Sequence, residues 1–372
     1  MSNMLLMSGV VEALRKAGLE VRADSRHAGD VLLRRLAVPD SPLAVVRPRH
    51  VDEVAAALAV ARETGVPLTS RGAGTSVVGN AVGRGIVLDF SRHLNRVLDV
   101  DPAARTAVVE PGTVHAVLQK AVMPHGVRFG PDPSTHPRCT IGGMIGNNAC
   151  GSRSLAYGRT SDNVAGLELL TAAGDRLVTG YDDRGAAFAR GADSLVADLR
   201  DVVGARLATA RTEFDRFGRQ VSGYAVQHLL PERFDLGRAL VGSEGTLAVI
   251  TQATVKLVVD APVRVVVVLG FPDIIAAERG GTGRGRARAH LLRGARLAPG
   301  RRAARPPRPG RRPAAAPRRG LALRRAGRRG ARRGGRAGPE AGGRRHRRGP
   351  RRRGPRHPGP AVAHPRGRRG PG

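Results

Sequence analysis

The stretch T-I-G-G-M-I-G-N-N-A-C-G, residues 140–151, combines four glycines with two asparagine amides. Glycine lets backbone N–H and C=O groups come close to a ligand because it has no Cβ. Asparagine offers a hydrogen-bond donor and an acceptor on the same side chain. This composition is typical of a segment that lies against a flat ligand. Its candidate contact residues are Gly142, Gly143, Asn147, Asn148 and Gly151.

A second glycine-rich loop, R-G-A-G-T-S-V-V-G-N over residues 71–80, follows a short predicted strand. Successive N–H groups in such a loop form an anion-binding nest, and Thr75 and Ser76 add hydroxyl donors. The loop departs from the dinucleotide fingerprint G-x-G-x-x-G because Val77 stands at the third glycine. The sequence also lacks the phosphate loop G-x-x-x-x-G-K-[ST]. The pyrophosphate of a larger cofactor fits what remains.

A third loop, G-S-E-G-T-L over residues 242–247, again places small residues at the start of a predicted strand. One such loop alone is more often a plain surface turn than a ligand site. Three of them in one chain are hard to explain as turns, so they favour a shared ligand site.

The rest of the chain from Leu43 alternates between strand and helix patterns. Helices are predicted over 51–64, ended by Gly65, and over Val114–Met123. The predicted strands are Leu43–Val46, Pro67–Ser70, Ile86–Phe90, Arg96–Val100, Thr106–Glu110, Leu167–Thr171, Leu177–Thr179, Leu247–Val259 and Val263–Leu269. This order predicts an α+β fold with mixed sheets.

The formal charge of +33 is concentrated at one end of the chain. Residues 279–372 hold 32 Arg and one acid, Glu340, which is +31 and leaves +2 for residues 1–278. A segment of Arg, Gly, Pro and Ala cannot bury enough apolar area to order itself, so we predict disorder. Its composition also matches a GC-rich gene read in the wrong frame, which we favour over a nucleic-acid-binding arm. Arms of that kind usually interleave aromatic residues, and this segment has none.

Several classes of protein are disfavoured by the sequence. No stretch approaches the roughly 20 apolar residues of a membrane span, and Met1–Gly18 lacks the uninterrupted apolar core of a signal peptide. Two cysteines, Cys139 and Cys150, cannot form a disulfide framework or an iron–sulfur cluster. We therefore expect no bound metal and a cytoplasmic location, with peripheral attachment at the inner face of the membrane as an alternative.

Read together, the motifs resemble the FAD-binding domain (PCMH type) of the vanillyl-alcohol oxidase superfamily. They are similar above all to its D-lactate, glycolate and D-2-hydroxyglutarate dehydrogenase branch, which includes long FAD plus iron–sulfur fusion proteins. The motifs are S-R-G-A-G-T-S (70–76), F-G-P-D-P-S (129–134), T-I-G-G-M-I-G-N-N-A-C-G (140–151), Y-G-R-T-S-D-N-V (157–164) and G-S-E-G-T-L-A-V-I-T (242–251). The resemblance implies a PCMH-type two-subdomain FAD-binding fold over 43–276, between an N-terminal segment, 1–42, and the low-complexity tail, 279–372.

The resemblance also implies which residues contact FAD. They are Arg71, Gly72, Ala73, Gly74, Thr75, Ser76, Gly79 and Asn80 at the pyrophosphate; Pro131, Asp132 and Ser134; Gly142, Gly143, Asn147, Asn148 and Gly151 along the isoalloxazine and ribityl chain; Val164; and Glu244, Gly245 and Ile250. Some relatives attach FAD covalently through a histidine in the first loop. Thr75 occupies that position, so non-covalent FAD is implied.

The function implied is a dehydrogenase of a D-2-hydroxy acid such as D-lactate, with hydride passing from the substrate Cα to flavin N5. Electrons would leave to an iron–sulfur protein, a quinone or a cytochrome. In the family a cap domain follows and holds the substrate carboxylate and the proton-abstracting base. Here the Arg-rich tail stands in its place, so we expect the cap to be missing and name no catalytic residue. A shifted frame over residues 288–301 can read E-G-L-D-S-R, which resembles the start of that cap.

Other interpretations stay open at this point. One is a UDP-N-acetylmuramate-reductase-like or sugar-oxidase member of the superfamily, which the P-D-P-S and G-N-N-A-C-G wording disfavours. Another is an FAD-binding fragment without activity, and a third is a nucleic-acid-binding protein acting through the tail. For Cys139 and Cys150 we expect packing beside glycines, and for His136 an orienting or solvent-facing position. Asp101 and Asp175 are interpreted as turn residues.

Overall fold

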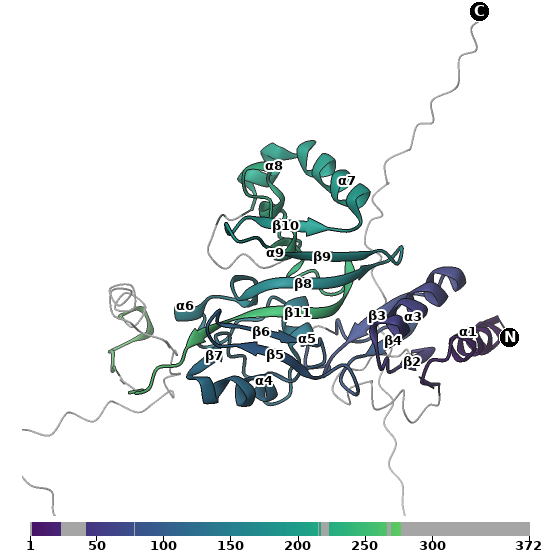
Figure 1. Cartoon of the computed structure of the whole chain (residues 1–372), viewed down its shortest axis with the longest axis horizontal. Coiled ribbons are helices and arrows are strands. Elements are labelled where there is room, and N and C mark those ends of the chain that lie inside the picture. Colours follow the sequence, from purple (N-terminus) through teal and green to yellow (C-terminus); the bar gives the residue numbers. More distant parts are fainter. Residues whose placement is uncertain are drawn as a thin grey trace, which may run out of the picture. The chain divides into compact units, whose positions relative to one another are not determined.

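The computed structural model describes residues 2–23, 42–77, 79–214, 216, 223–265 and 269–276 (Figure 1). The predictions for the tail, 279–372, and for most of the second half of 1–42 therefore lie outside the described residues. The chain divides into two units, 1–298 and 299–372, and every described element belongs to the first.

The first glycine-rich loop, residues 71–80, follows an edge strand of a four-stranded sheet. Its strands, in spatial order, are β1 (Val21–Arg22), β2 (Ala44–Val46), β4 (Ile86–Asp89) and β3 (Leu68–Arg71). The strands β2, β4 and β3 are parallel, whereas β1 is antiparallel to β2. Parallel strands of one sheet need a crossover connection, and helix α3 (Val51–Thr64) connects β2 to β3, which lie on either side of β4.

The second sheet is antiparallel and is organised around one long strand. Its spatial order is β10-β9-β8-β11-β6-β5, and β7 pairs with the far end of β11. The bounds are β5 (Val97–Asp101), β6 (Thr106–Val109), β7 (Val127–Phe129), β8 (Val164–Thr171), β9 (Arg176–Tyr181), β10 (Ala187–Arg190) and β11 (Ala248–Val259). Because β11 pairs with β8, β6 and β7, it is the strand that joins this sheet together.

The remaining elements are short helices that cover these sheets or connect their strands. The α-helices are α1 (Ser2–Lys16), α4 (His115–Val122), α5 (Ile141–Gly146), α6 (Ser154–Tyr157), α7 (Asp193–Gly204), α8 (Leu207–Thr212) and α9 (Leu236–Leu240). The 3₁₀ turns are η1 (Met123–His125), η2 (Thr160–Asp162), η3 (Val226–Leu229) and η4 (Pro231–Arg233).

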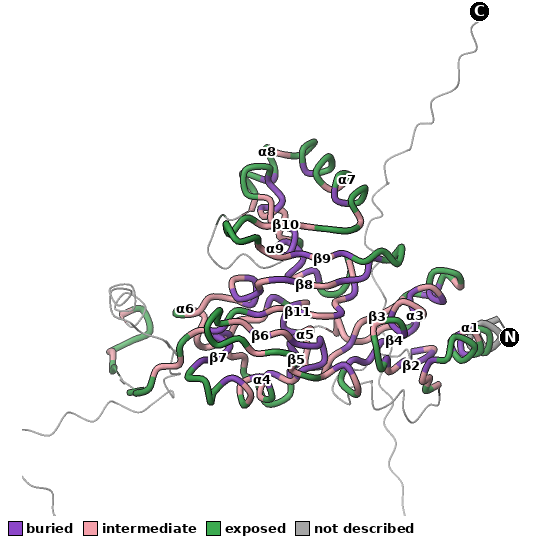
Figure 2. Tube along the Cα trace, in the orientation of Figure 1, coloured by how far each residue is buried: buried purple, intermediate pink, exposed green. Residues whose placement is uncertain are grey.

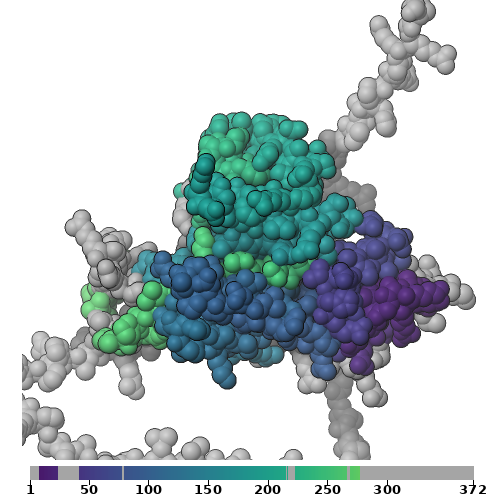
Figure 3. All heavy atoms as spheres, viewed as in Figure 1, coloured from purple at the N-terminus to yellow at the C-terminus, as the bar shows by residue number. Residues whose placement is uncertain are grey.

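The two sheets share part of their packing. One apolar core lies between the large sheet and the helices α4, α5 and α9, and another lies between the small sheet and the helices α1 and α3 (Figure 2). Leu170 of β8 and Val249 of β11 belong to the second core, so the large sheet packs against the small one. In the space-filling view the corresponding segments are in contact (Figure 3). This packing brings the glycine-rich loops of both sheets to one place.

The predicted elements agree with the structure at most positions, and the α+β class with mixed sheets is confirmed. Helix α3 has the predicted bounds, and Gly65 ends it in the left-handed conformation at φ 66°. The strand predicted over Val263–Leu269 is wrong for its described residues, 263–265 and 269, which are not in a strand. The exposed fractions there are 76% for Val263 and 81% for Val265, so no neighbouring strand or core stabilises an extended arrangement.

Helix α5 was not predicted, because its three glycines disfavour helix. One local and one tertiary contribution outweigh that propensity. The hydroxyl of Thr140 accepts a hydrogen bond from the Gly143 N–H as an N-cap, and Ile141, Met144 and Ile145 are buried in the larger core. None of the described helices is both long enough and apolar enough to span a bilayer.

The larger core can be tested at two adjacent positions of α4. The Leu118→Ala variant should lower the free energy of unfolding by about 2–5 kcal/mol, because Leu118 is 0% exposed. The matched Val117→Ala variant should change it by less than about 0.5 kcal/mol, because Val117 is 50% exposed. Urea unfolding followed by far-UV circular dichroism measures both values. Equal losses in the two variants would contradict the packing.

Candidate functional site

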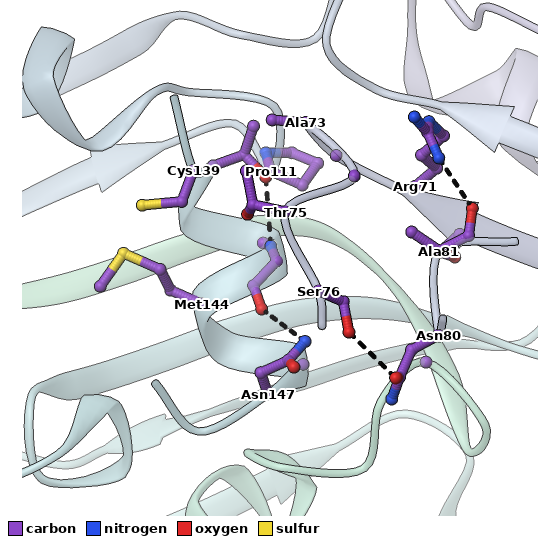
Figure 4. Close-up of a pocket in the computed structure, with 18 of the residues that line it drawn as sticks. Arg71, Ala73, Thr75, Ser76, Asn80, Ala81, Pro111, Cys139, Met144 and Asn147 are labelled. Atoms are coloured by element: carbon purple, nitrogen blue, oxygen red, sulfur yellow. Dashed lines mark hydrogen bonds between the residues drawn. The ribbon is translucent and has the colours of Figure 1, made fainter. Parts of the chain in front are cut away.

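The three glycine-rich loops line one cleft of about 1010 Å³, open solvent included (Figure 4). The cleft lies beyond the carboxyl ends of the parallel strands β3 and β4, where ligands usually bind in sheets of this kind. Helix α5 forms the opposite wall, and the residues before and at the start of β11 close one side.

The loop after β3 presents a row of backbone amides without partners. Strand β3 ends at Arg71, whose carbonyl accepts a hydrogen bond from Phe90 N at 2.9 Å. Within the described part of the chain, none of the N–H groups from Gly72 to Ser76 donates to a backbone or side-chain acceptor. Gly74 is buried and the other four residues are partly exposed, and all five line the cleft. A row of free amides at such a position is suited to bind an anion.

Arg71 lies beneath this loop and adds positive charge to it. The residue is 7% exposed, and its Nη1 donates to the Ala81 carbonyl at 3.1 Å (Figure 4). Its guanidinium fills the space beside Gly74, since a Cβ there would lie 2.4 Å from Nη2. Burial lowers the pKa of Arg71, but a guanidinium stays charged at neutral pH. The loop is closed by Ser76 Oγ, which donates to Asn80 Oδ1 at 3.0 Å.

Helix α5 offers the cleft a face of glycines. A Cβ on Gly72 would lie 2.0 Å from Thr140 Oγ1, so the loop and the helix N-cap touch. The amides of Ile141 and Gly142 donate to the carbonyls of Thr113 and Pro111, at 2.8 Å each. The first turn of α5 therefore has no free amide at these two positions. Its contribution is close backbone approach for a flat group.

The loop before β11 is held against the far end of α5. Gly242 N donates to Ile145 O and Glu244 N donates to Gly146 O, each at 2.9 Å. Glu244 adopts φ 57°, a strained conformation for a residue with a Cβ, and its side chain lines the cleft. Nearby, Ser70 also lines the cleft, and its buried Oγ has no hydrogen-bond partner among the described residues.

The structure gathers most of the predicted FAD-contacting residues around this cleft. Those that line it are Arg71, Gly72, Ala73, Gly74, Thr75, Ser76, Asn80, Gly142, Gly143, Asn147, Glu244, Gly245 and Ile250. Those that do not line it are Gly79, Pro131, Asp132, Ser134, Asn148, Gly151 and Val164. Contact of either set with FAD stays a prediction.

Several residues of the second set have other partners in the fold. Val164 begins β8 and is 4% exposed in the larger core. Asn148 Oδ1 accepts from Ser161 N at 3.0 Å and faces a separate small pocket. A Cβ on Gly151 would lie 2.1 Å from the carbonyl oxygen of Asp132, so the two backbones are in close contact.

Other lining residues were not predicted. They are Ser70, Ala81, Phe90, Pro111, Pro133, Thr135, Cys139, Thr140, Met144, Gly146, Ala149 and Ala248. Most of them directly precede or follow a predicted residue, so extending each motif by one or two positions would have included them. Phe90 and Pro111 come from the ends of β4 and β6, and only the tertiary fold brings them here.

The residues given a non-catalytic interpretation behave mostly as expected. Cys139 is 5% exposed, and burial raises the pKa of its thiol, so it packs as a neutral side chain. The side chain of His136 is 51% exposed, with Nδ1 at 3.6 Å from Asp132 Oδ1. Asp101 Oδ1 accepts from Ala104 N at 2.8 Å in a turn.

Comparison with known proteins shows which protein family this part of the chain resembles. Residues 42–180 match the family described as the FAD binding domain. The chain is 34% identical over 262 residues to D-2-hydroxyglutarate dehydrogenase of Pseudomonas putida, covering 66% of this chain and 26% of that protein. It is 36% identical over 227 residues to the Escherichia coli protein of that name (58% and 22%), and 32% identical over 278 residues to glycolate oxidase subunit GlcD of Bacillus subtilis (73% and 50%).

These findings define a class first: the chain contains a PCMH-type FAD binding domain, and FAD is its cofactor. Within that class it is similar to proteins named D-2-hydroxyglutarate dehydrogenase and glycolate oxidase subunit GlcD. The chain spans between about a quarter and a half of the length of these relatives. The residues present fit the cofactor, because free amides, a buried guanidinium and a glycine face suit a diphosphate joined to a flat ring.

Gly74 tests the diphosphate assignment. The Gly74→Asp variant should lose detectable FAD binding, because a carboxylate beside the amide row would repel the diphosphate. The Gly74→Ala variant is the matched control, since it has the same positive φ of 65° and the same crowding against Arg71 without the charge. FAD titration monitored by flavin fluorescence measures both, and we expect tighter binding for Ala than for Asp. Equal affinity of Gly74→Asp and the parent chain would contradict the assignment.

His115 makes stability depend on pH. It is 1% exposed, and burial lowers its pKa, so the folded chain keeps it neutral. The unfolded chain binds a proton there below about pH 6.5. The free energy of unfolding should therefore fall as the pH drops below about 6.5, by up to roughly 1.4 kcal/mol per pH unit from this residue.

The His115→Gln variant separates this contribution from that of other groups, because its amide can donate a hydrogen bond but does not titrate. Urea unfolding between pH 7.5 and 5 should show a shallower pH dependence for the variant. The same slope for both chains would show that His115 does not carry the effect.

Proposed function

We propose that this chain is an FAD-dependent oxidoreductase that dehydrogenates a D-2-hydroxy acid. The observation that carries the proposal is the row of amides at 72–76 that have no acceptor among the described residues, in a loop that lines the same cleft as the glycines of α5. The names of the relatives, D-2-hydroxyglutarate dehydrogenase and glycolate oxidase, supply the substrate class. D-2-hydroxyglutarate, glycolate and D-lactate are the substrates to test.

The cofactor is divided among the three walls in this proposal. The amides of 72–76, with Asn80 and the Arg71 charge, bind the diphosphate. Gly142, Gly143 and Asn147 lie along the isoalloxazine and ribityl chain, while Glu244, Gly245 and Ile250 contact the cofactor from the start of β11. Binding is non-covalent, since Thr75 carries no nucleophilic ring nitrogen for attachment.

The bound flavin supplies a hydride acceptor for the carbon that bears the substrate hydroxyl. In this proposal the residues that line the cleft bind and orient the flavin and exclude water from it. Among the described residues that line the cleft, only Arg71, Cys139 and Glu244 are ionisable. The thiol of Cys139 is kept protonated by burial, and Arg71 is directed to Ala81. We assign no proton-abstracting base to this set.

Electrons leave to an iron–sulfur protein, a quinone or a cytochrome in this account.

We further propose that residues 43–276 are the FAD-binding domain and that residues 279–372 are a frame-error product in place of a cap. Resequencing the coding DNA across codons 270–305 tests the second point. A single missing or extra base near codon 280 would support it, and a confirmed frame would overturn it.

The activity is tested by anaerobic mixing of the FAD-loaded chain with each hydroxy acid. Loss of flavin absorbance near 450 nm should follow one of the three acids; for the two chiral acids it should follow the D-enantiomer and not the L-enantiomer, whereas glycolate is achiral. Reduction of an artificial dye acceptor measures turnover. Stoichiometric FAD with no bleaching by any of the three acids would favour the alternative, an FAD-binding fragment without activity.

A further inference from the structure

One wall of the cleft is a segment whose own amides make few backbone hydrogen bonds. Pro133 and Thr135 line the cleft, and they follow β7, which ends at Phe129. Pro131 and Pro133 have no N–H to donate. The carbonyls of Pro133 and Thr135 accept hydrogen bonds from the amides of 136, 138 and 139, so a backbone turn supports the end of the segment. The part that precedes this turn is held largely by side chains from other elements.

Two of these side chains come from helix α4. Gln119 binds the backbone of Phe129 twice, with Nε2 donating to the carbonyl at 2.8 Å and Oε1 accepting from the amide at 3.1 Å. His115 Nε2 lies 2.8 Å from the Pro131 carbonyl oxygen. Since a carbonyl only accepts, the proton must be on Nε2, and the buried Nδ1 has no partner.

The third anchor is an ion pair at Asp132. Arg153 Nε donates to Asp132 Oδ2 at 2.9 Å, and the two side chains are only 22% and 20% exposed. Arg128 Nη2 lies 3.8 Å from the same carboxylate oxygen, and His136 Nδ1 lies 3.6 Å from the other. Arg128 is also 3.6 Å from Asp260, where the chain leaves β11. The carboxylate thus faces cations and not the cleft.

Arg153 lies two residues after the segment 140–151, so this pair joins two cleft walls to each other. The contact is reinforced by Gly151, whose φ of 138° lets its backbone pack on the Asp132 carbonyl. A charge-assisted hydrogen bond between partly buried groups is stronger and more directional than one between exposed groups. It can therefore fix a proline-rich segment that has few backbone donors.

We propose that Arg153 and Asp132 are positioning residues for the cofactor: their ion pair holds Pro133 and Thr135 at the cleft wall. The inference rests on the proposed FAD site. In this inference Asp132 acts as a positioning residue, whereas its motif predicted a direct contact with the cofactor. Neither residue lines the cleft, so their effect on FAD passes through the 129–135 segment.

The test is a double-mutant cycle on the full chain. The Arg153→Met and Asp132→Asn variants should each raise the Kd for FAD roughly tenfold, and the double variant should raise it no further, because both remove one interaction. Arg153→Lys should recover part of the affinity, since it keeps the charge and loses the Nε geometry. Arg138→Met is the matched control, because it removes one exposed Arg near the same segment without touching Asp132.

Two further readouts separate positioning from general stability. The visible circular dichroism of bound flavin, at saturating FAD, should change in Arg153→Met and stay unchanged in Arg138→Met. The thermal midpoints of the apo chains identify any variant that fails to fold, in which case Arg153→Lys carries the comparison.

The outcomes distinguish this inference from the proposed function. Unchanged Kd and unchanged flavin dichroism in Arg153→Met, with FAD binding lost in Gly74→Asp, would overturn the positioning inference and leave the FAD site standing. Additive effects in the double variant would also overturn it. Full FAD affinity in Gly74→Asp would overturn the proposed site, and the positioning inference with it.

Discussion

The site depends on one constraint, which is that five consecutive backbone amides of a cleft-lining loop have no acceptor within the described part of the chain. Buried or half-buried N–H groups normally find an acceptor within the fold, and leaving them free costs stability. The loop from Gly72 to Ser76 keeps this arrangement because its surroundings are fixed. Arg71 fills the space beneath Gly74, and Thr140 fills the space beside Gly72. Neither contact leaves room for a side chain at those positions.

The other walls follow from the way the sheets meet. The amide row lies at the end of β3 in the small parallel sheet, and the residues that lead into β11 belong to the antiparallel sheet. Leu170 and Val249 of the large sheet pack in the core of the small sheet. Apolar burial therefore fixes the position of the loop after β3 relative to the residues before β11. Helix α5 then contacts both, through Thr140 at one end and through Ile145 and Gly146 at the other. The cleft is thus a consequence of packing between the subdomains and not of any single motif.

Much of this could be predicted from the sequence, for reasons that differ by element. The helix over 51–64 is bounded by local sequence signals, namely acids in its first turn and Gly65 at its end. These signals act within the helix itself, so they do not depend on the rest of the fold. The amide row was predicted because successive N–H groups in a glycine-rich loop can form an anion-binding nest, and because three such loops in one chain favour a shared site. Helix α5 was missed because burial of Ile141, Met144 and Ile145, which no local pattern reports, overrides the low helix propensity of its glycines. For Asp132 the motif predicted a cofactor contact, which stays a prediction, and the residue does not line the cleft. The charges that face its carboxylate come from Arg128 and Arg153, and only the tertiary fold shows them.

The central claim is that the amides of 72–76 bind the diphosphate of FAD. Hydrogen–deuterium exchange of the peptide that covers this loop measures it directly, because an amide that gains an acceptor exchanges more slowly. The account predicts slower exchange in this peptide with saturating FAD or ADP, and no change with riboflavin, which has no phosphate. FAD binding that leaves exchange at 72–76 unchanged, or equal protection by riboflavin, would contradict it.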